Sequence, residues 1–433
     1  MKKIVIVSYF FAPANIIGSI RMTKIAKYLQ KDGYEVEVVT SQNNSLLFQK
    51  ENNGYDQILV DDVKDINVVR VEHGTLYRHL AGFLRKEMYA KVALSGNNGS
   101  STGRKPSLKK KVLRYALYCM LWLQDLDFAS RAYREIDGKN RRDCIVISSY
   151  GPLASHLLAR KLRGRNKWIA DFRDPIAQSE NYPLEYRINR RVEKRIVEEC
   201  DEVVGVSSDY LKTILADCQK KANVVTNGYD SDELKYLSSS SSSKKLSICY
   251  TGTLYSGMRD IAPLFSSISE LISEGLVPRH GIEVVYAGVQ GDYVKSLAKR
   301  YEIDDIVLDR GLVTRVEALQ IQQDADVILC LTWNVAENVG YLPGKFLEHL
   351  MFKKEIIGWV SGQYQGSEMK RMIYELNIGE CYEESQENSI ELLKSYVFNL
   401  YKRERHEARE SLIASYDYRN ITKTYEEIIE ELA

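Results

Sequence analysis

Hydrophobic positions along the chain alternate between two patterns. Short apolar runs such as residues 3–8 (KIVIVS) and 35–41 (EVEVVTS) have the length and β-branched content of buried strands. Between them, residues 16–33 carry apolar side chains at helical spacing and end at Gly33. Strands that alternate with helices of this length form βαβ units, so the pattern predicts a parallel sheet.

The alternation continues, is interrupted once and then restarts. In the first half, further strands are expected at 144–149, 167–172, 202–208 and 222–226. A serine run at 238–243 is typical of an exposed connection. Beyond it, strands are expected at 246–252, 282–288, 305–311, 325–331 and 355–360. The sequence therefore predicts an α/β protein with two doubly wound, Rossmann-like parallel-sheet domains facing a cleft, with ligands at the carboxyl ends of the strands.

Composition excludes several other classes. A chain of 433 residues suits two domains of roughly 200 residues each. The net charge of +1 gives no indication of a nucleic-acid partner. Seven scattered cysteines without a CxxC pair indicate reduced thiols rather than disulfides or a zinc site. The N-terminal apolar run is broken by Pro13 and Asn15, so we interpret it as a first strand rather than a signal peptide, and no apolar stretch is long enough to span a membrane.

The stretch 338–350 (NVGYLPGKFLEHL) opens a helix at the carboxyl edge of the second predicted sheet. Glycines allow close backbone approach, and free N–H groups at a helix start attract an anion. Lys345 adds a point charge suited to phosphate, and Glu348, one turn further, can accept hydrogen bonds from sugar hydroxyls. The stretch indicates a nucleotide-sugar site. The alternative is an ordinary helix start with a solvated lysine and glutamate.

Two other motifs lie where predicted strands end. In YTGTLYSGMRD (250–260), Gly252 and Gly257 precede Arg259, an arrangement that suits phosphate, although a turn with a surface arginine is equally compatible. In DFRDP (171–175), the carboxylates could orient an acceptor hydroxyl and Arg173 could hold a phosphate; the alternative is an internal ion-pair network. No GxGxxG fingerprint occurs, which disfavours a dehydrogenase.

In their order and spacing, these motifs resemble the GT-B glycosyltransferases, in particular the large retaining family (glycosyltransferase family 4-like) that builds bacterial surface polysaccharides such as capsule and O-antigen. The matching segments cover nearly the whole chain and include SYFFAPANIIGSIRMTKIAKYLQKDGYEVEVVTS, ISSYGPLASHLLARKL, WIADFRDP, CDEVVGVSSDYLK, VVTNGYD, YTGTLYSGMRD, VVYAG, DADVILCL and GYLPGKFLEHL. The resemblance implies a nucleotide-sugar donor of the UDP or GDP type on the C-terminal domain. It implies a glycan or polyprenyl-diphosphate-linked acceptor on the N-terminal domain, and transfer of a hexosyl or N-acetylhexosaminyl group.

The resemblance also assigns residues. Glu348 matches the second glutamate of the family's E-x7-E motif and is expected to hold ribose. Arg259 and Lys345 stand at positions where the family places phosphate-binding cations. We expect these three residues to be catalytic. The expected donor-binding residues are Gly18, Gly252, Thr253, Arg259, Gly340, Leu342, Pro343, Gly344, Lys345 and Glu348. The expected acceptor-side residues are Tyr150, Gly151, Asp171, Arg173 and Asp174.

The chain departs from the family pattern at two places. Gly340 stands where the first glutamate of E-x7-E is expected, with Glu337 three residues earlier. Residues 148–152 (SSYGP) occupy the place where many members carry a histidine, and His156, which follows on a helix, is expected to have a packing or surface role. Gly340 in place of a glutamate keeps open a non-catalytic scaffold or binding subunit of the same fold. A nucleotide-sugar epimerase is the other alternative, although it needs acid–base groups beside the sugar and the cleft motifs offer few histidines.

No cofactor and no metal are expected. The DxD sequences at 125–127 and 230–232 lie within a helical pattern and beside the linker, respectively. A retaining transferase can let the acceptor attack from the leaving-group face, with a phosphate oxygen taking its proton, so the missing histidine does not exclude the reaction.

The expected domains are 1–237 on the acceptor side, a linker at 238–245, a nucleotide-sugar domain at 246–415, and a helix at 416–433 that the resemblance implies crosses back to the first domain. Within the first domain, a basic insert at about 78–118 has ten lysines or arginines between Arg78 and Arg114 and one acid, Glu87. This charge predicts peripheral contact with the anionic inner face of the cell membrane, and the reduced cysteines indicate a cytoplasmic protein. The alternative is a helix with a packed apolar stripe and solvated lysines.

Overall fold

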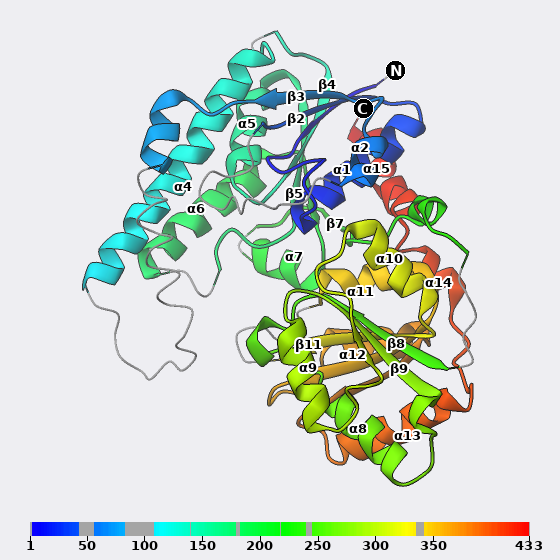
Figure 1. The fold of residues 1–433 in the computed structure, drawn as a ribbon. Coiled ribbons are helices and arrows are strands. Elements are labelled where there is room, and N and C mark those ends of the chain that lie inside the picture. Colours follow the sequence, from blue (N-terminus) through cyan, green and yellow to red (C-terminus); the bar gives the residue numbers. More distant parts are fainter. Residues whose placement is uncertain are drawn as a thin grey trace. The chain divides into compact units, whose positions relative to one another are not determined.

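The computed structural model describes residues 2–42, 56–82, 108–138, 140–178, 182–216, 218–239, 245–334 and 342–432. The chain forms two compact units (Figure 1). Unit 1 comprises Met1–Thr226 and Ile421–Ala433, and unit 2 comprises Asn227–Asn420. No helix among the described residues is long and apolar enough to cross a membrane.

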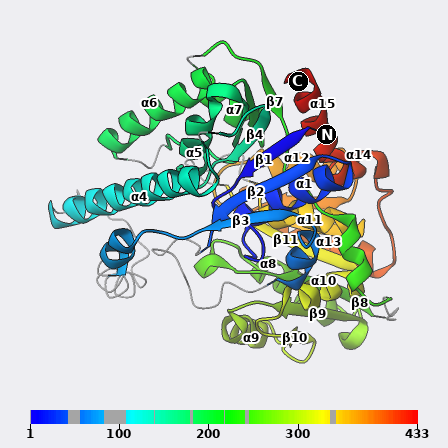
Figure 2. The same ribbon diagram turned by 90° about the horizontal axis from the view of Figure 1, so that it is seen from above.

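Unit 1 is built on a seven-stranded parallel sheet in the order β3-β2-β1-β4-β5-β6-β7. Its strands are β1 (Lys3–Val7), β2 (Glu35–Ser41), β3 (Asn67–Val71), β4 (Cys144–Ser149), β5 (Lys167–Phe172), β6 (Glu202–Gly205) and β7 (Ala222–Val224). Its helices are α1 (Ile17–Lys31), α2 (Gln57–Asp62), α4 (Leu108–Glu135), α5 (Ala154–Leu162), α6 (Pro183–Glu199), α7 (Ser208–Ile214) and most of α15 (Tyr418–Leu432). Side chains from α4 to α7 join one core cluster with the strands, and the long α4 is prominent in Figure 2.

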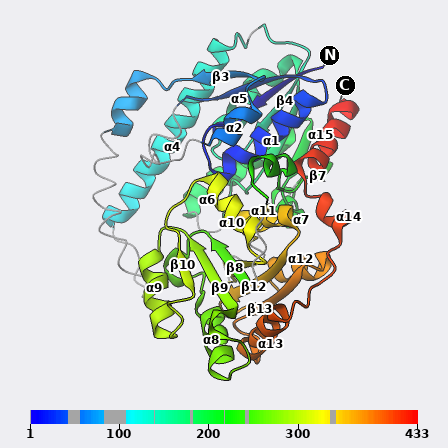
Figure 3. The same ribbon diagram turned by 45° about the vertical axis from the view of Figure 1, so that its right-hand side comes forward.

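Unit 2 is built on a six-stranded parallel sheet in the order β10-β9-β8-β11-β12-β13 (Figure 3). Its strands are β8 (Leu246–Thr251), β9 (Ile282–Ala287), β10 (Val307–Asp309), β11 (Val327–Trp333), β12 (Glu355–Ser361) and β13 (Gly379–Glu383). Its helices are α8 (Ala262–Ser273), α9 (Gly291–Arg300), α10 (Arg315–Asp324), α11 (Gly344–His349), α12 (Glu368–Leu376), α13 (Ser389–Tyr401) and α14 (Glu410–Ala414), and a short 3₁₀ helix, η2 (Ser231–Tyr236), precedes the sheet.

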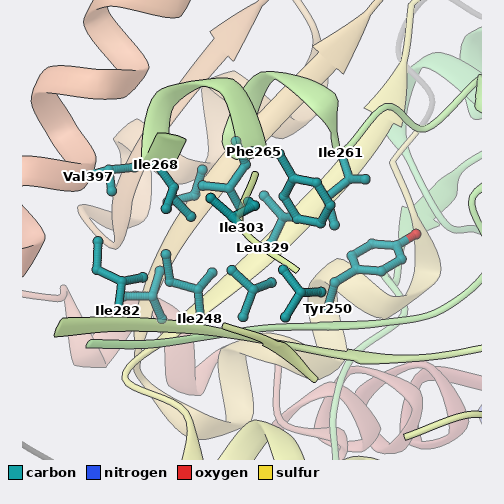
Figure 4. Packing of buried hydrophobic residues seen from close by; sticks show 14 of the residues in the cluster. Ile248, Tyr250, Ile261, Phe265, Ile268, Ile282, Ile303, Leu329 and Val397 are labelled. Carbon is teal, nitrogen blue, oxygen red and sulfur yellow. The ribbon is translucent and has the colours of Figure 1, made fainter. Parts of the chain in front are cut away.

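The core of unit 2 explains why the sequences of its strands are continuous apolar runs. Ile248 of β8 and Ile282 of β9 pack against Phe265 and Ile268 of α8 (Figure 4). Helices α9 and α13 add side chains to the same cluster. Because helices also pack on the opposite face, where α10 contacts β8 and α12 contacts β12, the central strands are buried on both sides.

In both sheets the strand order reverses beside the first strand. The reversal lies between β1 and β4 in unit 1 and between β8 and β11 in unit 2. At such a point the loops that leave neighbouring strands run in opposite directions and open a crevice outside the carboxyl ends. The loop after β8 holds the motif 250–260, and residues 342–350 follow β11, so the topology accounts for the approach of these two segments.

The predicted fold class is confirmed: both units are doubly wound parallel sheets. The edge strands β3 and β13 are not predicted by the sequence pattern, because NVVRV and GECYE carry charged residues and lack a continuous apolar run. The structure divides the chain at residue 226, whereas the sequence placed the boundary at 237. Residues 227–237 belong to unit 2 because the amide of Tyr229 donates to the carbonyl of Tyr416 at 2.9 Å, and that of Tyr418 donates to the carbonyl of Tyr229 at 2.8 Å.

Candidate functional site

The loop that leaves β8 is held in a defined shape. The hydroxyl of Tyr250 donates to the carbonyl of Thr253 at 3.0 Å, and the amide of Gly252 donates to the carbonyl of Ala287 at 2.9 Å. A Cβ atom on Gly288 would lie 2.2 Å from the carbonyl oxygen of Gly252, so the two loops approach each other more closely than any other residue would permit. The backbone of 251–253 is therefore fixed at the point where the strand order reverses.

Lys345 reaches this loop from the first turn of α11. Its Nζ atom donates to the carbonyl of Thr251 at 3.0 Å. The residue as a whole is exposed, but its ammonium group points inward, and the loss of hydration lowers the pKa of Lys345. The charges of Arg315 and Arg259 lower this pKa further, and that of Glu348 raises it. Glu348, Arg315 and Arg259 are therefore close enough for their charges to act on Lys345.

Arg259 approaches the same loop from its far end. Its Nη1 atom donates to the carbonyl of Thr253 at 3.3 Å. Its guanidinium carbon lies 4.7 Å from the ring centre of Tyr255 and 5.5 Å from that of Trp333, within cation–π range. The buried Nε atom has no hydrogen-bond acceptor among the described residues. A guanidinium held on aromatic faces with an unused donor is suited to an anionic ligand.

Glu348 is ionised and held by an arginine. Its Oε2 atom lies 2.7 Å from Nη1 of Arg315. Burial opposes the charge of Glu348, but the charges of Arg315 and Lys345 outweigh that effect and lower its pKa to about 2. On its other side, Arg315 donates from Nη2 to Oε2 of Glu233 at 2.7 Å. The carboxylate is therefore an acceptor of fixed orientation over the whole physiological pH range.

A buried polar chain supports this site from behind. Nδ1 of His349 lies 2.8 Å from Oε1 of Gln322, and Nε2 of Gln322 donates to the hydroxyl of Thr251 at 3.1 Å. Burial lowers the pKa of His349 to about 4, so the ring is neutral at pH 7. The chain connects α11, α10 and the end of β8, which fixes the elements that carry Lys345 and Glu348.

Arg315, Glu233, Gln322 and His349 were missed by reasoning from the sequence. Glu233 and Arg315 come from separate segments, so no local spacing joins them. Arg315 does carry one sequence signal. It opens α10 directly after the capping residue Thr314, and a cation in the first turn of a helix is electrostatically unfavourable. An arginine at such a position therefore indicates an interaction outside its own helix.

In unit 1, Asp171 lies inside an internal network. The carboxylate is fully buried and accepts from Nε and Nη2 of Arg21 at 3.1 and 2.7 Å. It also accepts from the hydroxyls of Ser149 and Tyr425, each at 3.0 Å. All four hydrogen bonds stay within unit 1, so the structure favours the internal-network alternative for Asp171 over an acceptor contact.

Arg173 brings together residues that the sequence assigned to two different ligands. Its Nε donates to the carbonyl of Tyr150 at 2.7 Å, and its Nη2 donates to that of Gly151 at 3.0 Å. A Cβ atom on Gly18 would lie 2.5 Å from Nη1, and one on Gly151, whose φ is 102°, would lie 2.2 Å from Nη2. Gly18, expected on the donor side, therefore lies against the acceptor-side guanidinium. Asp174 is exposed.

Several expected residues have other outcomes. Gly340, Glu337 and most of the basic insert lie outside the described residues, whereas Leu342 is partly buried and Pro343 precedes α11 as its cap. His156 is buried, as the packing interpretation expects: its Nδ1 lies 2.7 Å from the hydroxyl of Ser148, and burial lowers its pKa to about 3. Within the insert, Arg114 pairs with Glu185 at 3.1 Å.

The DxD sequences also have structural partners. Asp125 is buried in α4, and Asp127 accepts from the amide of Gly74 at 2.9 Å. The side chain of Asp230 caps η2 by accepting from the amide of Asp232. The carboxylate of Asp232 in turn accepts from Nη2 of Arg419 at 2.6 Å. Asp127, Asp230 and Asp232 are thus part of the hydrogen bonding within their own units.

No protein-family model matches the sequence, and no curated protein matches it either. Solved structures do match. Sucrose-phosphate synthase from Thermosynechococcus elongatus has a TM-score of 0.58 at 13% identity, over 100% of this chain and 99% of that one. The chain has the GT-B fold. The lipopolysaccharide outer core galactosyltransferase WaaB gives a TM-score of 0.55 at 12% identity over 100% of both chains. A UDP-N-acetylglucosamine 2-epimerase gives 0.54 at 12% identity over 100% of this chain and 95% of that one. At these identities the similarity establishes the fold alone.

Proposed function

We propose that the protein is a retaining glycosyltransferase that binds a nucleotide-diphosphate sugar of the UDP or GDP type on unit 2. The observation that supports this most is the convergence of Arg259 and Lys345 on the two ends of segment 251–253, with ionised Glu348 beside them. Two cations suit a diphosphate, and a fixed carboxylate suits ribose hydroxyls. The two cations and the carboxylate thus match the diphosphate and the ribose of a nucleoside diphosphate, respectively.

In the reaction, the bond between the anomeric carbon and the diphosphate oxygen breaks, and its electron pair stays on the leaving diphosphate. Arg259 and Lys345 stabilise the negative charge that develops there. The acceptor hydroxyl oxygen forms the new bond to the anomeric carbon on the same face, and its proton passes to a diphosphate oxygen. No metal or cofactor is required by this scheme.

The acceptor is proposed to be a glycan or a polyprenyl-diphosphate-linked sugar of a bacterial surface polysaccharide such as capsule or O-antigen. The basic insert at 78–118 supports a cytoplasmic protein in contact with an anionic membrane that carries such a lipid. Arg173 and the glycines beside it form the acceptor-side group in this proposal, and Asp171 is assigned to the framework of unit 1.

A nucleotide-sugar epimerase and a non-catalytic binding subunit are the competing functions, because the same fold occurs in proteins of both transferase and epimerase type. The three functions share nucleotide binding and differ in product. A transferase releases nucleoside diphosphate when an acceptor is present, an epimerase returns a changed nucleotide sugar without an acceptor, and a binding subunit does neither.

The first experiment is thermal unfolding with UDP, GDP and other nucleoside diphosphates and with their sugars, on the wild type, Arg259→Gln and Lys345→Ala. A ligand at a hundred times its dissociation constant stabilises the folded state by about 2.7 kcal/mol. We expect one base to be selected and its shift to be lost in both variants. The matched control is Arg279→Gln, which removes an exposed ion pair with Asp305 in the same unit.

If no nucleotide stabilises the wild type, the proposal is wrong. If one does, incubation of the protein with that nucleotide sugar, followed by chromatography of the products, separates the three functions. A changed nucleotide sugar without an acceptor would assign the epimerase.

A further inference from the structure

Three charged side chains form a chain that leads to the candidate ribose-binding carboxylate. Nη2 of Arg315 lies 2.7 Å from Oε2 of Glu233, and Nη1 lies 2.7 Å from Oε2 of Glu348. The Arg315 side chain is 12% exposed, against 2% for Glu233 and 16% for Glu348. All three belong to unit 2, and they come from α10, η2 and α11.

The two oxygens of Glu348 are used differently. Oε2 is bound by Arg315, while no described residue donates a hydrogen bond to Oε1. The Glu348 side chain is 16% exposed, and because Arg315 pairs with Oε2, we take Oε1 as the oxygen offered to a ligand. A glutamate side chain rotates about three torsions, and an arginine nitrogen on one carboxylate oxygen restricts the directions that the other oxygen can take.

Helix stability does not account for Arg315. The residue stands at the first position of α10, where a cation is disfavoured by the helix dipole. Removing three charges from water is also costly, and apolar residues of the same size would stabilise the unit as well or better. The arginine is explained by what it does to the two glutamates, and of these Glu348 is the one whose side chain is partly exposed and can meet a ligand.

We propose that Arg315, itself held by Glu233, is the positioning residue that orients Glu348 toward the ribose hydroxyls of the bound nucleotide. This inference rests on the proposed function, because it assigns a partner to Oε1 of Glu348. The carboxylate is aligned by an ion pair within the protein, so a ligand does not have to order it on binding. Glu233 prevents Arg315 from turning away toward other anions.

The test compares nucleotides that differ only in ribose. Dissociation constants for UDP, GDP and their 2′-deoxy and 3′-deoxy forms are measured by calorimetry on folded wild type, Arg315→Gln, Glu233→Gln and Glu348→Gln. A hydrogen bond to a charged acceptor corresponds to about a tenfold preference for the hydroxylated form. We expect this preference in the wild type, its loss in Glu348→Gln and Arg315→Gln, and a partial loss in Glu233→Gln.

Further variants separate positioning from folding. Arg315→Lys keeps a cation between the two glutamates and is expected to restore part of the preference. The double variant Arg315→Gln with Glu348→Gln is expected to lose no more than Glu348→Gln alone, because both changes remove the same contact. Arg279→Gln, which removes an exposed ion pair in the same unit, is expected to keep the full preference.

Two results would overturn the inference, and they differ from a failure of the proposed function. If the wild type prefers the hydroxylated nucleotide and Arg315→Gln keeps that preference, Arg315 does not position Glu348. If Arg315→Gln instead weakens UDP and both deoxy forms equally, Arg315 contacts the phosphates. If the wild type binds no nucleotide, or binds all forms alike, the donor-site assignment of Glu348 itself is wrong.

Discussion

Replacing Asp171 with asparagine tests whether this buried carboxylate belongs to the framework of unit 1. Asparagine has nearly the same shape but no charge. In the wild type the carboxylate is fully buried and accepts four hydrogen bonds, two of them from Arg21, which is also fully buried. Arg21 has two further acceptors, the carbonyls of Thr226 and Val225, at 2.7 and 2.8 Å.

The expected magnitude follows from the charge that is left behind. In Asp171→Asn the guanidinium of Arg21 stays buried without its counter-ion, and the new amide group faces donors rather than acceptors. Breaking a buried pair on one side costs about 3–5 kcal/mol. For a domain of this size each kcal/mol lowers the melting temperature by roughly 2–4 °C, so the variant should melt roughly 10 °C below the wild type.

The assay is unfolding in urea and by heat, followed by circular dichroism and tryptophan fluorescence. Trp122 and Trp168 lie in unit 1, and Trp333 and Trp359 lie in unit 2, so single-tryptophan backgrounds report each unit separately. The matched control is Asp174→Asn in the same motif. Because Asp174 is exposed, its change should be within about 0.5 kcal/mol.

The reasoning would be refuted by a stable variant. If Asp171→Asn unfolds within about 1 kcal/mol of the wild type and instead raises the KM for acceptor, the carboxylate acts on a ligand. If both variants are equally destabilised, the loss does not come from the buried charge.

Two further outcomes are expected. Gly288→Ala places a Cβ atom 2.2 Å from the carbonyl oxygen of Gly252, so it should lower the free energy of unfolding by about 1–3 kcal/mol and weaken nucleotide binding. The control is Gly164→Ala, where a Cβ atom would have no atom within 4 Å. In the same titration this control should change neither stability nor binding. Burial lowers the pKa of His349 to about 4, below an unfolded value of about 6.5, so the unfolded state binds the extra proton as pH falls. Acidification from pH 6.5 to 5 should therefore cost about 1.6 kcal/mol more in the wild type than in His349→Asn. Equal losses of the two proteins in urea titrations would contradict this pKa of His349.

Much of the fold follows from the sequence because its signals are local. Buried parallel strands read as apolar runs, and 3–8 and 246–252 coincide with β1 and β8 to within two residues. Two of the four edge strands, β3 and β13, lack that signal, because an edge strand has a neighbour on one side only and tolerates charge. The boundary at 226 also depends on pairing between distant segments, Tyr229 with 416–418, which no local pattern contains.

For the site, the sequence determined which residue types stand near the carboxyl ends of the strands of unit 2, among them Arg259, Lys345 and Glu348. Only the tertiary structure decided how their charges are used. It placed Asp171 in a buried pair with Arg21, set Gly18 against Arg173, and brought Glu233 and Arg315 to Glu348. An ion pair between distant segments depends on where the folded backbone brings its two ends. The spacing of residues along the chain carries no record of that distance.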